Sequence, residues 1–388
     1  MQLFLQDASL RRFYNTNMLL HISKVAKKLR CKRLFRKLLL LRHFPYKKHF
    51  SSVEDAEKYV NSLYPDVDNS CVCHNIIKRP YQYDLEIIIP VYNVEPFIEQ
   101  CMQSVLTQQT QYTFVVVVVN DGSTDGSRNI LKEYEDDERV RIIDQENLGL
   151  SGARNTALQN IMAKYVMFLD SDDFLAEGSI QNLMSAAINE DADIVEGSYI
   201  SFSPRTNITV KQKKGNLLPS MLRGYAWGKV IKSDRFERIQ FPFGYWFEDT
   251  LMRLVLYRLT RKNFGIEEVV YYHRSNPNGI SHKAKGHYKS IDSFYITRRL
   301  LKDEKLLNIE MTEELFQTFI ERQIAINTIR ISSVLDSKMN YAHFMLTCAM
   351  IDKIWGQKEF VSNSEKANKI YKAIKERNYM HFIAYCIV

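Results

Sequence analysis

The clearest pattern of apolar and polar positions lies between residues 85 and 169, where short apolar runs alternate with amphipathic stretches. Phe114–Val119 is an uninterrupted, valine-rich run, which is typical of a strand buried on both faces of a parallel sheet. Residues 96–107 instead place Phe97, Cys101 and Val105 at helical spacing. The alternation predicts strands over 85–90, 114–119, 140–143 and 165–169, with helices over 96–107 and 151–163. We therefore expect an α/β open sheet flanked by helices, with Pro90 ending the first strand.

The rest of the chain has a helical texture. Residues 53–63 predict a short helix inside a linker, and residues 286–388 predict helices over 288–301, 312–334, 340–355 and 364–376. We expect three parts: a basic arm and linker over 1–83, a sheet domain over 84–285, and a C-terminal helical region over 286–388. The apolar end, 382–388, is too short to span a bilayer. It could be buried, assist membrane contact, or pair with a second subunit, so a homo-oligomer is open.

Positive charge is concentrated near the N-terminus. Residues 8–53 carry 13 Lys and Arg and no Asp or Glu, whereas residues 54–388 carry 40 basic and 44 acidic residues. A nearly neutral body argues against nucleic acid as a partner. Within residues 18–41, Met18, Ile22, Val25 and Leu29 recur at helical spacing among many Lys and Arg, as in helices that lie on an anionic membrane surface. A helix that packs its leucines on the body is an equal alternative.

The cysteines and the first residues of the chain bear on the cellular compartment in which the protein is expected. The first residues lack the basic start and apolar core of a signal peptide, and no stretch reaches the ~18 apolar residues of a membrane span. Residues 71–74 read Cys-Val-Cys-His but lack a second pair at zinc-finger spacing, so a bound zinc is not expected. We expect a cytoplasmic protein, peripheral at the inner face of the membrane.

Three carboxylates follow the fourth predicted strand. The apolar Phe168-Leu169 leads directly into Asp170, Asp172 and Asp173. Crowded carboxylates repel one another, so the cluster predicts a cation, most simply a divalent metal that bridges protein oxygens to substrate phosphates. We expect Asp173 to brace the segment that follows it.

Polar residues also follow the first two strands, at 90–93 and 120–126. Since ligands of open α/β sheets bind beyond the carboxyl ends of the strands, the three clusters predict one crevice. Asp121 can accept the N–H of a pyrimidine or a ribose hydroxyl, or it can cap a turn. Arg154 follows the expected N-cap, Ser151, and can approach a phosphate or pin a carboxylate.

The segments 87–93, 119–125, 147–155 and 168–173 occur in the order and spacing seen in the family 2 glycosyltransferases. The chain resembles this family over about residues 85–285. The resemblance implies the GT-A fold and a nucleotide-sugar-dependent transfer that inverts the anomeric carbon. It also implies that Asp170 and Asp172 form a D-x-D pair that holds Mn²⁺ or Mg²⁺, with Asp172 the more direct ligand. The implied donor-binding residues are Pro90, Tyr92, Asp121, Arg154, Asp170, Ser171 and His282.

A second acidic pair is expected for the acceptor side, because a base must take the proton of the attacking hydroxyl. Residues 227–230 and 241–250 resemble the stretch that leads to the family's Glu-Asp pair, which implies Asp249 as the base with Glu248 orienting it or contacting the acceptor. Both acids could also simply open a helix over 250–259. Residues 271–282 resemble the family's closing loop, in which His282 could complete the metal shell.

These observations predict a metal-dependent glycosyltransferase with a UDP-sugar donor and a glycan or lipid-linked oligosaccharide acceptor in surface polysaccharide assembly. A protein-directed or teichoic-acid-directed enzyme, and an inactive homologue that binds sugar or serves as a scaffold, remain alternatives. A nucleotidyltransferase is disfavoured because residues 90–93 lack a Gly-rich basic loop. Trp227 and Trp246 fit a sugar platform and a core position equally well. The sequence does not name the sugar.

Overall fold

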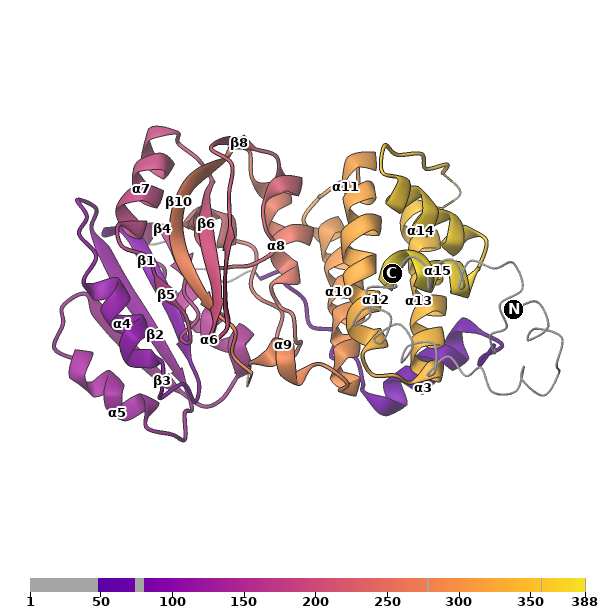
Figure 1. Cartoon of the computed structure of the whole chain (residues 1–388), viewed down its shortest axis with the longest axis horizontal. Coiled ribbons are helices and arrows are strands. Elements are labelled where there is room, and N and C mark those ends of the chain that lie inside the picture. Colours follow the sequence, from indigo (N-terminus) through magenta and orange to yellow (C-terminus); the bar gives the residue numbers. More distant parts are fainter. Residues whose placement is uncertain (1–47, 74–79, 278, 357, 388) are drawn as a thin grey trace. The chain divides into compact units, whose positions relative to one another are not determined.

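The computed structural model describes residues 48–73, 80–277, 279–356 and 358–387 (Figure 1). The predicted basic helix over 18–41 lies outside these residues. The chain divides into two compact units. A sheet unit contains Asp68–Pro277 and Arg299–Ile309, and a helical unit contains the other described residues.

The sheet unit begins before residue 84 because residues 71–73 pair with a segment far along the chain. The backbone N–H of Cys73 donates to the carbonyl of Arg238, and that of Gln240 donates to the carbonyl of Cys71. The unit also ends before residue 285, since Asn278–Arg298 groups with the helices.

The sheet unit is built on one mixed sheet of ten strands, eight of which follow the order β3-β2-β1-β4-β9-β6-β10-β5, with β7 and β8 off this path. Its parallel part consists of β1 (Tyr83–Val91), β2 (Phe114–Asp121), β3 (Val140–Gln145) and β4 (Ala163–Phe168). Every residue of β2 is buried, as the valine-rich run predicts. The four predicted strands are therefore confirmed, and their carboxyl ends lie along one edge.

The second half of the sheet is mixed. Strand β9 (Lys229–Lys232) runs antiparallel between β4 and β6 (Ile194–Ser203), and β10 (Asn263–Arg274) runs parallel to β6. The short strands β5 (Phe174–Leu175) and β8 (Gly215–Leu217) pair with β10, and β7 (Thr206–Val210) pairs with β6. Residues 271–274, expected in a closing loop, are thus the end of a strand.

Helices cover the sheet (Figure 1). Buried side chains of α4 (Ile98–Leu106), α5 (Ser127–Leu131) and α7 (Ser179–Asn189) join those of β1, β2 and β4 in one apolar cluster. Helix α6 (Gly149–Leu158) packs against β1 and β2 outside that cluster. The α/β class predicted from the sequence is confirmed.

Two local predictions are wrong. Pro90 does not end β1, which continues to Val91 with Pro90 paired to Val119. The backbone nitrogen of Pro90, which carries no hydrogen, points toward β4. The pairing of β1 with β4 has already ended at Ile88 and Phe168, so the proline costs the sheet no hydrogen bond. Ser151 is not an N-cap, because α6 begins at Gly149, where glycine tolerates a φ of +75°.

The helical unit contains the C-terminal helices and α3 (Val53–Leu63), which coincides with the predicted short helix. Polar side chains cap several of its helices: Ser52 caps α3, Asp336 caps α13, and Ser364 caps α14. A π-helical segment, Phe319–Ile324, joins α11 to α12 within the predicted 312–334 helix. The remaining helices are α9 (Ile280–Lys283), α11 (Glu313–Thr318), α12 (Ala325–Ser332), α13 (Ser337–Trp355), α14 (Glu365–Lys375) and α15 (Tyr379–Ile387). Helix α10 (Asp292–Leu306) begins in this unit, and its residues from Arg299 on belong to the sheet unit.

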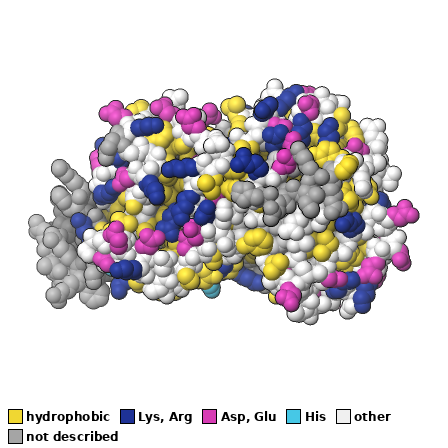
Figure 2. All heavy atoms as spheres, turned by 180° about the vertical axis from the view of Figure 1, so that it is seen from behind, with side chains coloured by type: hydrophobic (Ala, Val, Ile, Leu, Met, Phe, Trp, Pro, Cys, Tyr) yellow, Lys and Arg dark blue, Asp and Glu magenta, His cyan; other side chains and the backbone are white. Residues whose placement is uncertain are grey.

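Two surface properties bear on partners. In the described part of the chain, no helix is both long enough and apolar enough to cross a membrane. Basic and acidic side chains are interspersed with hydrophobic ones over the face shown in Figure 2. Neither sign of charge covers that face.

Candidate functional site

The loops after β1 and β2 are tied together at the carboxyl edge of the sheet. The backbone N–H of Asn93 donates to Ser123 Oγ at 3.2 Å, and Asn93 Oδ1 accepts from the N–H of Thr124 at 2.8 Å. Glu95 Oε2 accepts from the N–H of Gly126 at 2.8 Å. Beside these contacts Tyr92 is 49% exposed, whereas Pro90 is buried. The two sequence clusters therefore form one wall.

Asp121, the last residue of β2, contacts the segment that leads into α6. Its Oδ1 accepts from Gln145 Nε2 and from the N–H of Leu148, both at 2.7 Å. The side chain is 2% exposed, and no hydrogen bond from the described residues reaches its Oδ2. The carboxylate therefore positions the segment that leads into α6, while its predicted contact with a base remains a prediction.

Asp173 is a brace within the carboxylate cluster, and its partners lie on β10. Its Oδ2 accepts from the Tyr271 hydroxyl at 2.8 Å, and its Oδ1 accepts from the N–H of Arg274 at 2.6 Å. Burial, followed by the charges of Asp172 and Asp170, raises the pKa of Asp173 well above its ordinary value. The carboxylate thus ties the D-x-D turn to the distant strand β10.

Asp172 is held from the same side. Its Oδ2 accepts from Asn276 Nδ2 at 2.8 Å, and its backbone carbonyl accepts from Arg274 Nε at 2.8 Å. The Arg274 guanidinium lies over the rings of Phe97 and Phe202, 4.8 and 4.7 Å from their centroids. Sequence reasoning missed Arg274, since nothing local to residue 274 shows that it reaches the D-x-D turn. Burial raises the pKa of Asp172 above its ordinary value, and the charge of Asp170 adds to the rise.

Arg154 joins the two acidic sites. Its Nη2 donates to Asp170 Oδ1 at 2.8 Å and its Nη1 to Glu248 Oε1 at 2.6 Å. The side chain is 2% exposed, and its guanidinium lies over the rings of Phe168 and Phe241. The sequence allows Arg154 to contact a phosphate or to pair with a carboxylate. The structure shows it paired with two carboxylates. Ser171, between the two D-x-D acids, is also buried.

Glu248 and Asp249 follow a strained residue. Phe247 is buried with a φ of +66°, a left-handed conformation that is costly for an aromatic residue and often marks functional sites. Helix α8 (Thr250–Leu254) begins directly after Asp249, but the Asp249 side chain makes no capping hydrogen bond. Burial raises the pKa of Glu248, while the charge of Arg154 opposes the rise.

Trp227 is a core residue. It is 7% exposed, and its ring is stacked between those of Tyr225 and Tyr271, at centroid distances of 4.4 and 4.5 Å. Both of its faces are therefore covered. His282 lies exposed in α9 of the helical unit, and its predicted contact with the donor remains a prediction.

The D-x-D pair fits a divalent metal by its chemistry. Mg²⁺ and similar ions are commonly bound by one or two carboxylates together with substrate phosphates and water. Asp170 and Asp172 supply hard oxygens, and a cation beside them would offset the burial and the charge of Asp170, which raise the pKa of Asp172. Among the residues that the structure describes, no group of three or more His, Cys, Asp and Glu side chains could hold a metal. Substrate phosphates and water commonly supply further ligands to such ions.

Comparison with known proteins connects this site to a family. The family described as "Glycosyl transferase family 2" matches residues 86–249. Glycosyltransferase GlyA of Streptococcus pneumoniae is 34% identical over 218 residues, which cover 51% of this chain and 31% of that protein. Uncharacterized glycosyltransferase EpsJ of Bacillus subtilis is 33% identical over 216 residues, covering 51% of this chain and 62% of that protein. The chain thus matches only part of the length of these relatives.

The crystal structure of S. aureus TarS is similar in fold. It superposes with a TM-score of 0.56 at 17% identity, covering 77% of this chain and 54% of that chain. The region that matches the family, residues 86–249, runs from β1 through the D-x-D turn to Asp249. These elements build the candidate site. Residues 86–249 therefore match glycosyl transferase family 2, and the sheet unit has the GT-A glycosyltransferase fold.

Proposed function

We propose that the sheet unit transfers a sugar from a nucleotide-sugar donor to a hydroxyl of an acceptor glycan, by a single displacement that inverts the anomeric carbon. The observation that carries the proposal is the bridge of Arg154, which links Asp170 to Glu248, the neighbour of Asp249. Such a transfer needs one acidic group on the side of the leaving diphosphate and another on the side of the attacking hydroxyl. The bridge supports the presence of both in one crevice.

The donor in this proposal is a UDP-linked sugar. The joined loops after β1 and β2 form a wall that includes Pro90 and the exposed Tyr92. Asp121 directs Oδ1 to protein donors, which leaves Oδ2 to accept the N–H of a uracil ring. These features support a nucleotide site at the carboxyl ends of β1 and β2.

Asp172 and Asp170 would hold the Mn²⁺ or Mg²⁺ ion. A bound ion of this kind neutralises charge on a departing diphosphate. The protein keeps both carboxylates in place through neighbours: Asn276 and Arg274 hold Asp172, and Arg154 holds Asp170. His282 remains a candidate for a further ligand or a diphosphate contact.

Asp249 is the proposed base. Its side chain does not serve as the cap of α8, although α8 begins at the next residue. Glu248 is paired with Arg154, so it is suited to orient the site rather than to accept a proton. The strained backbone at Phe247 supports a functional demand on the direction of these two side chains.

The acceptor class is a cell-surface glycan polymer. Two further relatives support this: Minor teichoic acid biosynthesis protein GgaB of Bacillus subtilis, 27% identical over 218 residues, and Teichoic acid poly(glycerol phosphate) polymerase of Staphylococcus epidermidis, 42% identical over 110 residues. A teichoic-acid-type acceptor is therefore the second candidate, beside a polysaccharide or lipid-linked oligosaccharide. Either acceptor fits a protein that works at the inner face of the membrane.

Donor hydrolysis tests the proposal. We expect the full chain to hydrolyse at least one member of a panel of UDP-sugars with Mn²⁺ present and to lose this activity with a chelator. Asp249→Asn should lower this hydrolysis at least about 100-fold, because the proposed base would also take the proton of an attacking water and general bases contribute on the order of 10² to 10⁴. The exposed Asp136→Asn serves as the matched control. Full activity in Asp249→Asn removes Asp249 as the base, and an inactive wild type favours the scaffold alternative.

A further inference from the structure

A stack of aromatic rings leads outward from the carboxylate cluster. The Tyr271 hydroxyl donates to Asp173, and the N–H of Asp170 donates to the Tyr271 oxygen at 3.2 Å. The ring of Tyr271 stacks on Trp227 with an angle of 13° between the planes, and Trp227 stacks on Tyr225 with an angle of 4°. The stack therefore begins at the D-x-D turn and ends at Tyr225.

Tyr225 is the exposed end of this stack. Tyr271 is fully buried and Trp227 is 7% exposed, whereas Tyr225 is 38% exposed. One face of the Tyr225 ring covers Trp227, and Tyr199 approaches edge-on with a centroid distance of 6.1 Å. Tyr225 is thus the solvent-exposed member of the stack, in which Trp227 packs on Tyr225 and Tyr271 packs on Trp227.

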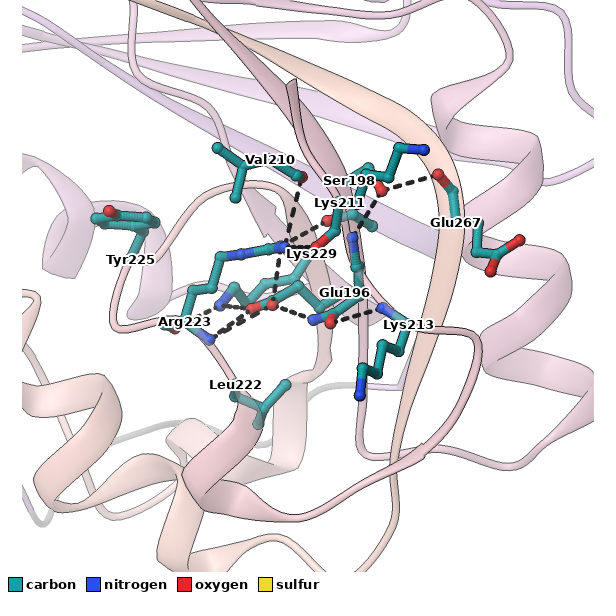
Figure 3. A network of polar contacts seen from close by, with 12 residues as sticks. Glu196, Ser198, Val210, Lys211, Lys213, Leu222, Arg223, Tyr225, Lys229 and Glu267 are labelled. Atoms are coloured by element: carbon teal, nitrogen blue, oxygen red, sulfur yellow. Dashed lines mark hydrogen bonds and ion pairs between the residues drawn. The ribbon is translucent and has the colours of Figure 1, made fainter. Parts of the chain in front are cut away.

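Buried charges hold the backbone that carries Tyr225 (Figure 3). Glu196 of β6 accepts from Lys229 Nζ at 2.6 Å, from the N–H of Arg223 at 3.1 Å and from Arg223 Nη1 at 3.2 Å. Lys229, which is fully buried, also donates to the Arg223 carbonyl at 2.9 Å. Figure 3 shows the Tyr225 ring apart from this network, on the other side of Arg223.

Tyr257 extends the support to Tyr225 itself. Lys229 Nζ donates to the Tyr257 hydroxyl at 2.7 Å, and this hydroxyl lies 3.2 Å from the carbonyl oxygen of Tyr225. A buried ion pair is costly unless each partner is fully hydrogen-bonded, and here Glu196 and Lys229 both are. The network therefore holds residues 223–225 rigidly beneath an exposed ring.

We propose that Tyr225 is the binding platform for a pyranose ring of the acceptor, and that the acceptor is an oligosaccharide chain. The apolar C–H face of a pyranose packs on an aromatic face, and the phenol hydroxyl can bond a sugar hydroxyl at its edge. Two rings separate Tyr225 from the D-x-D turn, so the sugar on Tyr225 is a unit beyond the one that reacts. This inference rests on the proposed function, because it names the acceptor class of that reaction.

Saturation-transfer NMR on the full chain tests the platform with cellobiose, maltose, lactose and N,N′-diacetylchitobiose as probes. We expect saturation of the ring C–H protons of at least one disaccharide with wild type and with Tyr225→Phe. Tyr225→Ala should reduce the signal about fivefold, in line with the strength of aromatic stacking. Tyr225→Leu, which still covers Trp227, should lose as much. Leu218→Ala is the matched control, because Leu218 is 58% exposed on the same loop.

The proposal is overturned if no disaccharide receives saturation from the wild type, or if Tyr225→Ala and Tyr225→Leu bind as well as the wild type. UDP-sugar hydrolysis by the same wild-type preparation separates this from the proposed function. Hydrolysis with unchanged disaccharide binding in both variants removes the platform alone. Absent hydrolysis with Tyr225-dependent binding removes the proposed transfer and leaves a carbohydrate site at Tyr225.

Discussion

Arg154 is the single residue on which the two acidic parts of the site depend. It is almost wholly buried, and its two terminal nitrogens each serve a different carboxylate, Asp170 and Glu248. Removing one member of a buried ion pair leaves the other charge without compensation, which is far more costly than losing a surface pair. The stability of the site should therefore respond strongly to this side chain.

Arg154→Met should lower the free energy of unfolding by about 3 kcal/mol, measured by urea denaturation at pH 8. Adding Glu248→Gln should restore part of the loss, because one of the two uncompensated charges is then removed. The control is Arg139→Met, whose guanidinium pairs with Asp137 with 41% of the side chain exposed. It should cost about 1 kcal/mol or less. Equal losses in the two variants would contradict the bridge.

Glu86 is another buried carboxyl, on β1. It is fully buried, one oxygen accepts from the N–H of Met162 at 3.0 Å, and the other has no partner. Burial raises its pKa to about 7. The folded state therefore holds a proton that the unfolded state releases near pH 4.5, and stability falls as the pH rises through the window between these values.

Glu86→Gln should remove this penalty. Compared with the wild type, the variant should gain stability progressively between pH 5 and pH 8, by up to about 3 kcal/mol. Urea denaturation at a series of pH values measures the difference, with the exposed Glu99→Gln as control. Parallel stability curves for the wild type and Glu86→Gln would show that the carboxyl titrates normally.

At the scale of elements, the pairing of β6 with β9 brings Glu196 and Lys229 together under the loop that leads to Tyr225. Lys229→Met should free this loop, because the Arg223 carbonyl keeps only the Tyr257 hydroxyl as a donor and Glu196 loses its closest cation. Hydrogen exchange of the amides of residues 222–226 should accelerate by at least about tenfold, which corresponds to about 1.4 kcal/mol of local stability.

Lys232→Met on the same strand is the control for that prediction. Lys232 pairs with Asp191, whose side chain is 82% exposed, so its loss should leave exchange at 222–226 unchanged. Unchanged exchange in Lys229→Met would show that the loop is held by other contacts.

The sequence predicts elements well where local pattern decides. The valines of β2 and the amphipathic pattern over 53–63 are local signals, and the strand and the helix that they predict are both confirmed. Strand β10 escaped prediction because register shifts between Gly265 and Tyr271 interrupt its alternation of apolar and polar residues. The start of α6 was missed because it depends on the left-handed backbone of Gly149.

The candidate site also contains features that the sequence predicts and features that it does not. The acids at 170, 172 and 249 were found because their types and order are visible in the sequence, and their roles remain predictions. The partners of Arg154 and Arg274 were not found, because both arginines act across long sequence separations. Only the folded sheet brings such partners together.

At the scale of the whole molecule, the sheet unit and the helical unit carry different expectations. The sheet unit holds every proposed catalytic group, and the basic arm over residues 8–53 is the proposed membrane contact. Deleting residues 1–50 should abolish flotation with anionic vesicles, because each Lys or Arg near such a surface contributes about 1 kcal/mol. Neutral vesicles provide the control. If the shortened chain floats as well as the full chain, the arm is not the contact.

The hold of β10 on the D-x-D turn has a consequence for how the site comes into being during folding. Asp172 and Asp173 precede their partners Tyr271, Arg274 and Asn276 by about a hundred residues. A growing chain that has just passed Asp249 therefore contains every carboxylate proposed for the reaction but lacks the strand that orders two of them. Long-range strand pairing of this kind forms slowly. Nucleotide binding should consequently appear as a late, all-or-none event of folding, after β10 has joined the sheet.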